Sequence, residues 1–298
     1  MRRRLCLMAM VILALSVVGP RLSAQKQGQV FVSLIAPNGT PVTDLQASEV
    51  GITEDGVDCK VLKLEPVNWP IKLHLLVDNG KPNTEPINSL RDGLKGLFEQ
   101  IPSGTEMSMY VTAGSPRPIV RPTTDRQKLL DGIALIAPDG GTGMFFDALF
   151  EAATRIDKDK DPNFPVILMV GSDLGRVNAR DRDYQKLQEI ILKRAVTVHI
   201  IVMAGHAGVG SSGGGAQTEI GLNVTKMSGG RYENIATTTR LATLLPEFGK
   251  RIADSAAKQQ HQYRVTYERP AKGNDQARIG ASVRRDGSFS LSLDGHQP

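Results

Sequence analysis

Residues 71–101 read IKLHLLVDNGKPNTEPINSLRDGLKGLFEQI, and this stretch decides the fold. Its first seven residues, 71–77, form a short apolar run of the kind that makes a buried strand. Apolar residues then recur at helical spacing, at Ile87, Leu90, Leu94, Leu97, Phe98 and Ile101. A buried strand followed by an amphipathic helix is the building unit of a parallel sheet.

The same alternation continues along the chain. Strand-like runs recur at 105–113 (TEMSMYVTA), 164–171 (FPVILMVG), 196–204 (VTVHIIVMA) and 230–235 (GRYENI). Helical patterns lie between and after them, at 125–136, 145–156, 184–195 and 241–256. Alternating β and α units predict an α/β fold: a doubly wound, mostly parallel sheet with helices on both faces.

Both ends of the chain have β character. Residues 29–67 contain strand runs separated by the turn signals Asn38-Gly39 and Asp55-Gly56, and QYRVTYERP and ARIGASVRR follow the last helix. We therefore expect an N-terminal β module (25–68), an α/β domain (69–257) and a C-terminal β segment (258–298). We expect the two β segments to pack together as a small β-sandwich, with the α/β domain inserted between them.

Residues 1–24 have the layout of a secretory signal peptide, with three arginines, an apolar run of about 14 residues and a small-residue cleavage site at Ser23-Ala24. The run is too short to span a bilayer, and no later segment is long and apolar enough, so we expect an exported chain without a membrane span. The formal net charge of +5 falls to +1 when the four arginines of residues 1–24 leave. The basic pI is therefore weak support for a nucleic-acid partner, and we predict none.

Three polar residues fall in loops that follow strands or precede a helix in the α/β domain. Asp78 follows the strand 71–77, Thr142 lies in the Gly-rich turn DGGTGMFFDAL, and Asp173 follows the strand ILMVGSD. In an open α/β sheet such loops meet at a crevice where ligands bind. Carboxylate and hydroxyl oxygens are the ligands that Mg²⁺ prefers, so these residues are a candidate metal site.

At these residues the sequence resembles the von Willebrand factor type A (VWA) family, and most closely its bacterial exported branch with a β segment before the domain. The resemblance extends over nearly all of residues 25–298, including the stretch NGTPVTDLQASEVGITEDGVDCKVLKLEPV and the later MSGGRYEN. It implies a Rossmann-like domain with a metal-ion-dependent adhesion site. In that site an Asp-x-Ser-x-Ser motif, a Thr and a second Asp hold Mg²⁺, and a carboxylate of the partner completes the coordination.

Carried over residue by residue, the resemblance assigns the metal ligands to Asp78, Thr142 and Asp173. The two serines are missing, because Gly80 and Pro82 occupy their positions. The site is therefore degenerate, and the missing hydroxyls favour the alternative that the two aspartates are solvated loop carboxylates or helix caps. Ser172 and the side-chain carbonyl of Asn79 are the available substitutes.

Two rival functions stay open. The segment Gly208-Val-Gly210-Ser-Ser-Gly213 matches G-x-G-x-x-G within the Gly-rich loop 205–215, so a nucleotide-dependent or hydrolytic enzyme is one alternative. Against it, the match lies in a Gly/Ser run, no H-E-x-x-H motif occurs, and His74 and His199 lie in apolar strands, where a core histidine hydrogen-bonded to backbone is the usual explanation. A structural envelope component with a vestigial site is the other.

The sequence thus predicts an exported, non-catalytic protein-interaction or adhesion module. We expect it to bind a protein or cell-surface ligand at the loops around Asp78, Thr142 and Asp173.

Overall fold

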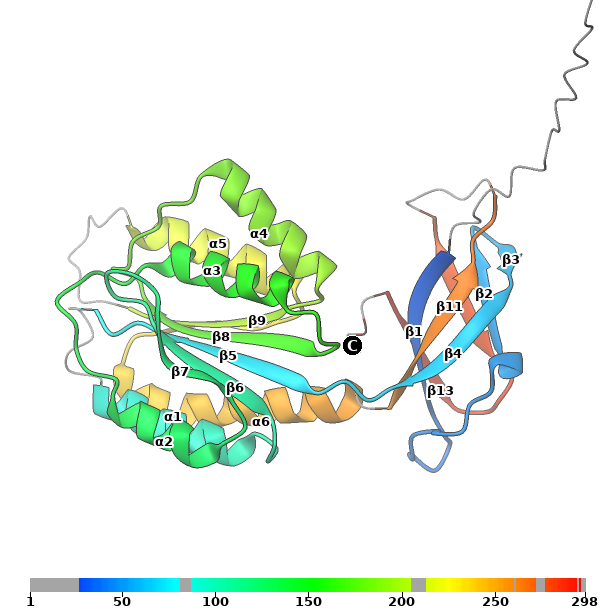
Figure 1. The fold of residues 1–298 in the computed structure, drawn as a ribbon, viewed down its shortest axis with the longest axis horizontal. Helices are drawn as coiled ribbons and strands as arrows, with labels where there is room; N and C mark the ends of the chain where they lie inside the picture. The colour runs from blue at the N-terminus through cyan, green and yellow to red at the C-terminus, as the bar shows by residue number, and fades with distance from the viewer. Residues whose placement is uncertain are drawn as a thin grey trace, which may run out of the picture.

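The computed structural model describes residues 27–80, 87–204, 213–259, 261–271, 277–293 and 295. The chain forms two lobes, an α/β body and a β-sandwich (Figure 1). The predicted signal peptide (1–24), Pro82 and most of the Gly-rich loop (205–212) lie outside the described residues.

The body is built on one sheet. Within the described residues it has six strands in the order β10-β9-β8-β5-β6-β7. Their bounds are β5 (Ile71–Val77), β6 (Glu106–Val111), β7 (Arg117–Thr123), β8 (Phe164–Ser172), β9 (Thr197–Met203) and β10 (Tyr232–Ile235). All neighbouring pairs are parallel except β6 and β7, which are antiparallel. The predicted mostly parallel sheet is confirmed, with an antiparallel strand, β7, added at one edge.

Helices cover both faces of this sheet. One face packs on α1 (Ile87–Gln100), α2 (Arg126–Ala134) and α6 (Leu241–Gln259). The other packs on α3 (Phe145–Lys158), α4 (Asp181–Lys193) and α5 (Gly213–Met227). The doubly wound arrangement predicted from the alternation of strands and helices is therefore confirmed.

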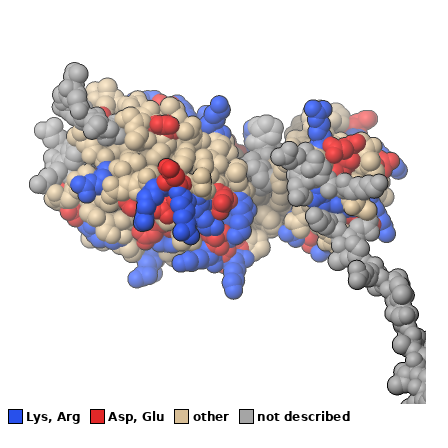
Figure 2. Space-filling view, turned by 90° about the horizontal axis from the view of Figure 1, so that it is seen from above, with Lys and Arg blue, Asp and Glu red and all other residues tan. Residues whose placement is uncertain are grey.

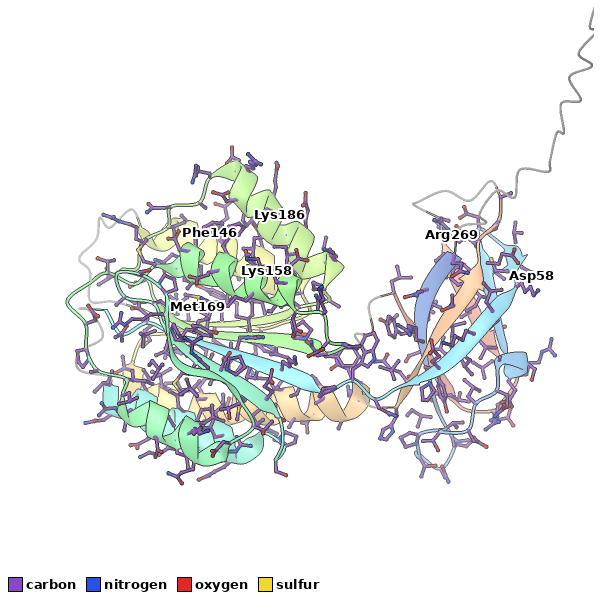
Figure 3. All side chains as sticks on the ribbon, viewed as in Figure 1. Asp58, Phe146, Lys158, Met169, Lys186 and Arg269 are labelled. Carbon is purple, nitrogen blue, oxygen red and sulfur yellow. The ribbon has the colours of Figure 1, made fainter. Side chains whose placement is uncertain are left out.

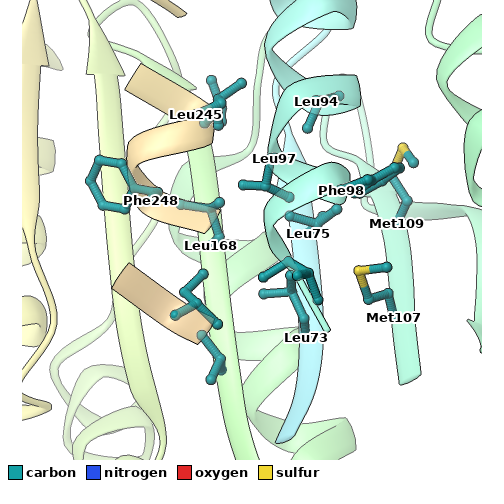
Figure 4. Packing of buried hydrophobic residues seen from close by; sticks show 14 of the residues in the cluster. Leu73, Leu75, Leu94, Leu97, Phe98, Met107, Met109, Leu168, Leu245 and Phe248 are labelled. Atoms are coloured by element: carbon teal, nitrogen blue, oxygen red, sulfur yellow. The ribbon is translucent and has the colours of Figure 1, made fainter. Parts of the chain in front are cut away.

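Alternation along the strands divides the core between the two faces. Leu73 and Leu75 of β5 point to the α1 and α6 side, where Leu97 of α1 lies beside them and Phe248 of α6 belongs to the same buried cluster (Figure 4). Leu76 points to the opposite layer, which also holds Phe146 of α3 and Met169 of β8 (Figure 3). Successive side chains of a strand point to opposite faces, so strands that are covered on both faces are apolar throughout.

The second lobe is made from both ends of the chain. A four-stranded sheet has the order β13-β1-β11-β4, and a three-stranded sheet has the order β12-β2-β3, among the described strands. The bounds are β1 (Gln27–Ile35), β2 (Val50–Glu54), β3 (Val57–Cys59), β4 (Val61–Val67), β11 (Gln262–Glu268), β12 (Ile279–Val283) and β13 (Ser288–Ser292). Each sheet combines N-terminal with C-terminal strands. The predicted sandwich with an inserted α/β body is confirmed.

The turn signals in the N-terminal β module have clear physical roles. Asp55 and Gly56 both have positive φ, +50° and +81°, and join β2 to β3 as a tight hairpin. Gly39, with φ of +82°, closes the turn after β1, where Val42 N–H donates to Leu34 O at 2.9 Å.

The lobes meet around Trp69. Its ring lies 5.8 Å from that of Phe31 in β1 and 5.4 Å from that of Phe164 in β8, and the Arg264 guanidinium lies 5.6 Å from its centre. One aromatic residue in the 68–70 link thus contacts a strand of each lobe.

Charged side chains of both signs interleave on the helical face seen in Figure 2. Ion pairs such as Lys193 to Asp157 (2.8 Å) and Lys186 to Glu189 (3.4 Å) lie on and beside α4. Among the helices that the structure describes, none combines the length and apolar character needed to cross a bilayer.

Candidate binding site at the carboxyl edge of the sheet

The order of the strands creates a crevice beside β5. The chain goes from β5 to β6 on one side, and later returns to place β8 on the other side. In doubly wound folds such a reversal separates the loops at the carboxyl ends of the strands and leaves room for a ligand. Asp78 and Asp173 follow the two adjacent strands at this point. The structure therefore brings both predicted aspartates to one rim of the sheet.

Asp78 is buried, with 2% of its surface exposed. Its backbone N–H donates to Val170 O at 2.8 Å, and its Oδ1 accepts the Gly80 N–H at 2.8 Å. Its other carboxylate oxygen lies against Gly143, where a Cβ would come within 2.2 Å of Oδ2. This carboxylate thus packs directly on the backbone of the loop that carries Thr142.

The loop with Thr142 is held on both sides by backbone hydrogen bonds. Gly114 N–H donates to Thr142 O at 2.9 Å, and Met144 N–H donates to Thr112 O at 3.0 Å. On the other side, Arg176 N–H donates to Gly143 O at 2.7 Å. Isolated β-bridges join the same segments. The side chain of Thr142 itself is exposed.

The side chain of Asn79 links two loops of the rim. Its Nδ2 donates to Ala137 O at 2.8 Å, and its Oδ1 accepts the Ala113 N–H at 3.3 Å. Both ends of the amide therefore bind backbone, and the carbonyl considered as a substitute metal ligand is already used in holding two loops together.

Asp139 is a second anchor of the same loop. The Gly141 N–H and the Arg117 guanidinium, whose Nη2 lies 2.8 Å from Oδ2, hold the pKa of Asp139 below its ordinary value. The carboxylate is therefore ionised at neutral pH and fixes the start of the Gly-rich turn.

Asp173 begins the third loop and is half-buried. Its N–H donates to Met203 O at 3.1 Å. The preceding Ser172 is 1% exposed, and its Oγ accepts the Leu174 N–H at 3.1 Å. The hydroxyl considered as a substitute ligand is thus engaged within its own loop.

The residues present supply only part of a magnesium site. Asp78, Thr142 and Asp173 come from loops of one rim, but Gly80 has no side chain and the substitutes Asn79 and Ser172 bind backbone. Within the described part of the chain, no group of three or more His, Cys, Asp or Glu side chains is arranged to hold a metal ion. Mg²⁺ binding therefore stays a prediction from the resemblance.

Of the two strand histidines, His199 is a core residue and His74 is partly buried. His199 is 4% exposed, and its Nδ1 accepts the Arg231 N–H at 3.0 Å. The Nδ1 atom of His74 lies 3.0 Å from the Ser108 hydroxyl, so the hydrogen-bond partner of this histidine is a side chain and not the backbone. Burial lowers the pKa of His74 to about 4 and that of His199 to about 3, so both are neutral at physiological pH.

Sequence reasoning missed several rim residues. Gln217 of α5 is fully buried; its Nε2 donates to Gly175 O, while its Oε1 has no hydrogen-bond partner among the described residues. The fully buried Thr112 Oγ1 likewise finds none there. The only sequence signal for Gly143 was its place in a Gly-rich turn. The glycines of the predicted G-x-G-x-x-G segment lie in the undescribed loop or, for Gly213, at the first residue of α5.

No family model matches this sequence, and no curated protein sequence matches it either. Solved structures do show similarity. A von Willebrand factor type A protein from Catenulispora acidiphila has a TM-score of 0.51 and 8% identity, over 91% of this chain and 73% of that protein. The pilus adhesin SpaC from Lactobacillus rhamnosus GG has a TM-score of 0.50 and 10% identity, over 82% of this chain but only 43% of the adhesin.

At such low identity these similarities show the fold alone. The body has the fold of VWA domains, as the resemblance at Asp78, Thr142 and Asp173 implied.

Proposed function

We propose that this chain is an exported, non-catalytic interaction module, which binds a protein or cell-surface ligand at the rim formed by the loops around Asp78, Thr142 and Asp173. The observation that carries the proposal is the set of backbone hydrogen bonds, 2.7–3.0 Å long, that join these loops to one another. Loops that are already fixed lose little conformational entropy when a partner binds. The exposed side chains on these loops, Thr142 and Arg176, are then available for contact.

The positions of the titratable groups support a binding role rather than a catalytic one. His74 lies four residues before Asp78 on β5, about 13 Å along the strand, and its depressed pKa makes it a poor proton carrier at neutral pH. On β9, His199 pairs in register with Leu168, one residue nearer the carboxyl end than the level of His74, and its pKa is also depressed. Export is supported by the signal-peptide pattern of residues 1–24.

The rim lies at the end of the body away from the sandwich (Figure 1). A substitution that blocks it can therefore be matched by one at the opposite edge. Thr142→Arg places a long cation on the rim, whereas Asn68→Arg makes the same kind of change at an exposed residue in the link between the lobes.

The test is affinity capture with residues 25–298 from the cell envelope and the medium of the source organism, quantified by mass spectrometry. We expect at least one protein to be retained by the wild type and by Asn68→Arg, and to be depleted at least tenfold with Thr142→Arg. Retention that is equal for all three chains would show that the rim is not the binding surface.

A further inference from the structure

A groove of about 650 Å³ lies between α1 and α2, at the amino edge of the body sheet. Phe98 near the end of α1, Ile101 in the following loop and Leu130 of α2 give it mainly apolar walls. Leu130 is 36% exposed, so part of this apolar surface faces solvent. Arg126, the first residue of α2, lines the same groove.

Arg126 is a half-buried cation without a carboxylate partner among the described residues. Its Nη2 donates to Ile101 O at 3.1 Å and to Pro102 O at 3.3 Å, and its Nη1 lies 3.8 Å from Met107 Sδ. A guanidinium has more N–H donors than these contacts use. Carbonyl oxygens accept hydrogen bonds but do not neutralise the charge, and burial lowers the pKa of the Arg126 guanidinium with no neighbouring carboxylate to offset that effect.

Other half-buried arginines of the described chain lie in different surroundings. Arg264 pairs with Glu65 at 2.9 Å. Arg194 donates to backbone carbonyls, but three aspartates line the same hollow. Arg91 donates to the carbonyls of Ala134 and Ile136 and is not part of the groove lining. The combination of an apolar groove with a guanidinium that lacks a counterion therefore distinguishes the site at Arg126.

The groove suits a polypeptide segment that carries both acidic and apolar side chains. A carboxylate binds a guanidinium through two parallel hydrogen bonds, and such charge-assisted bonds are stronger than neutral ones. Apolar side chains beside that carboxylate can pack on Phe98 and Leu130. Glu99 and Ser103 also line the groove, and their polar groups find partners on a polypeptide but not on the acyl chain of a fatty acid.

We propose that the groove between α1 and α2 is a docking site for an acidic segment of a partner protein. An Asp or Glu side chain of that segment binds Arg126, and its flanking apolar side chains pack on Phe98 and Leu130. The groove lies at the amino edge of the body sheet, whereas the rim lies at the carboxyl edge. The proposal therefore does not rest on the function proposed for the rim.

The experiment selects binders for residues 25–298 from a displayed library of random nine-residue peptides. We expect enriched peptides to share an Asp or Glu with apolar residues close to it in sequence. In the wild type, changing that residue to Asn or Gln should weaken binding at least tenfold, because its charge-assisted bonds to Arg126 are lost. In Arg126→Gln the same peptide change should weaken binding less than twofold, since the partner of the carboxylate is already gone.

Matched variants of the protein locate the site. Arg126→Gln should weaken binding of the enriched peptides at least tenfold. Lys128→Gln removes the same charge from α2 at a side chain that is 70% exposed and borders a different hollow, so it should alter binding less than twofold. Leu130→Ser should weaken binding at least fivefold, whereas Leu135→Ser, at the exposed C-cap of α2, should alter it less than twofold.

Thermal melts check that these variants are folded. If Arg126→Gln is unfolded, Leu130→Ser and the peptide changes measured on the wild type still test the groove. Thr142→Arg should bind the peptides like the wild type, so failure here and failure at the rim are distinguishable.

The proposal is overturned if acidic peptides are not enriched, or if Lys128→Gln weakens binding as much as Arg126→Gln. Equal weakening by the peptide change in the wild type and in Arg126→Gln would overturn it as well. Sodium octanoate that displaces the peptides at micromolar concentration would assign the groove to a fatty acid. In sedimentation, a concentration-dependent dimer lost in Arg126→Gln would assign it to a second copy, and either result would also overturn the proposal.

Discussion

Replacing Gly143 by alanine should destabilise the rim more than any other change of a single methyl group there. An added Cβ would lie 2.2 Å from Oδ2 and 2.4 Å from Cγ of Asp78, so the carboxylate has to move by about 1 Å or more. The loop cannot readily move instead, because Arg176 N–H binds Gly143 O at 2.7 Å and the opposite side is bridged to Ala113. Overpacking costs about 1–3 kcal/mol. Loss of the bond from Gly80 N–H to the carboxylate adds about 1.5–3 kcal/mol.

We therefore expect Gly143→Ala to lower the free energy of unfolding by about 3–5 kcal/mol, and the melting temperature by roughly 10 °C. Urea titrations followed by circular dichroism measure the first, and calorimetry measures the second. Gly215→Ala is the control, because a Cβ there meets nothing within 4 Å and alanine favours the α5 helix by up to about 1 kcal/mol. A Gly143→Ala protein as stable as the wild type would refute the close packing of Asp78 on this loop.

Three further results are expected. Lowering the pH from 7 to 5 should destabilise the fold by roughly 2 kcal/mol through His199: burial holds its pKa at about 3 in the folded protein, against 6.5 when unfolded, so the unfolded chain binds the proton first. The stability that neutral His199 contributes is complete above pH 6.5 and is lost as the pH falls toward 3. In urea titrations at pH 7 and pH 5, the change in the free energy of unfolding should be roughly 2 kcal/mol smaller for His199→Gln than for the wild type. Glu54→Ala should cost about 3–5 kcal/mol in chemical unfolding, because Glu54 is 1% exposed and pairs through both oxygens with Arg269 (Figure 3), whereas loss of the exposed Lys95 should change stability by less than about 0.5 kcal/mol. Partner binding at the rim should survive chelation with EDTA within twofold, as measured by the same capture assay; binding lost both on chelation and in Asp173→Ala would instead show that an ion is used.

Hydrophobic periodicity predicted the main architecture because the spacing of apolar residues along the sequence reflects which faces of a strand or helix are buried. The runs at 71–77 and 164–171 are apolar throughout since helices cover both sides of those strands. The strand β7 was missed because RPIVRPT has two prolines, which argue against a central strand and are tolerated only at an edge.

The rim was predicted only in outline. Strand ends and turn glycines located Asp78, Thr142 and Asp173, because parallel strands bring their following loops to one side. The hydrogen bonds that each side chain makes at the rim could not be predicted from the sequence. Whether the amide of Asn79 faces a ligand or binds Ala113 and Ala137 depends on loops 34 and 58 residues away, and no local pattern encodes those contacts.

The insertion of the body into the sandwich places the rim and the sandwich at opposite ends of the body (Figure 1). The chain passes between the lobes at residues 68–70 and again between α6 and β11, both at the amino edge of the body sheet and far from the rim. The ring contacts of Trp69 with Phe31 and Phe164 join a strand of each lobe at this crossing. A partner bound at the rim would therefore leave the sandwich uncovered.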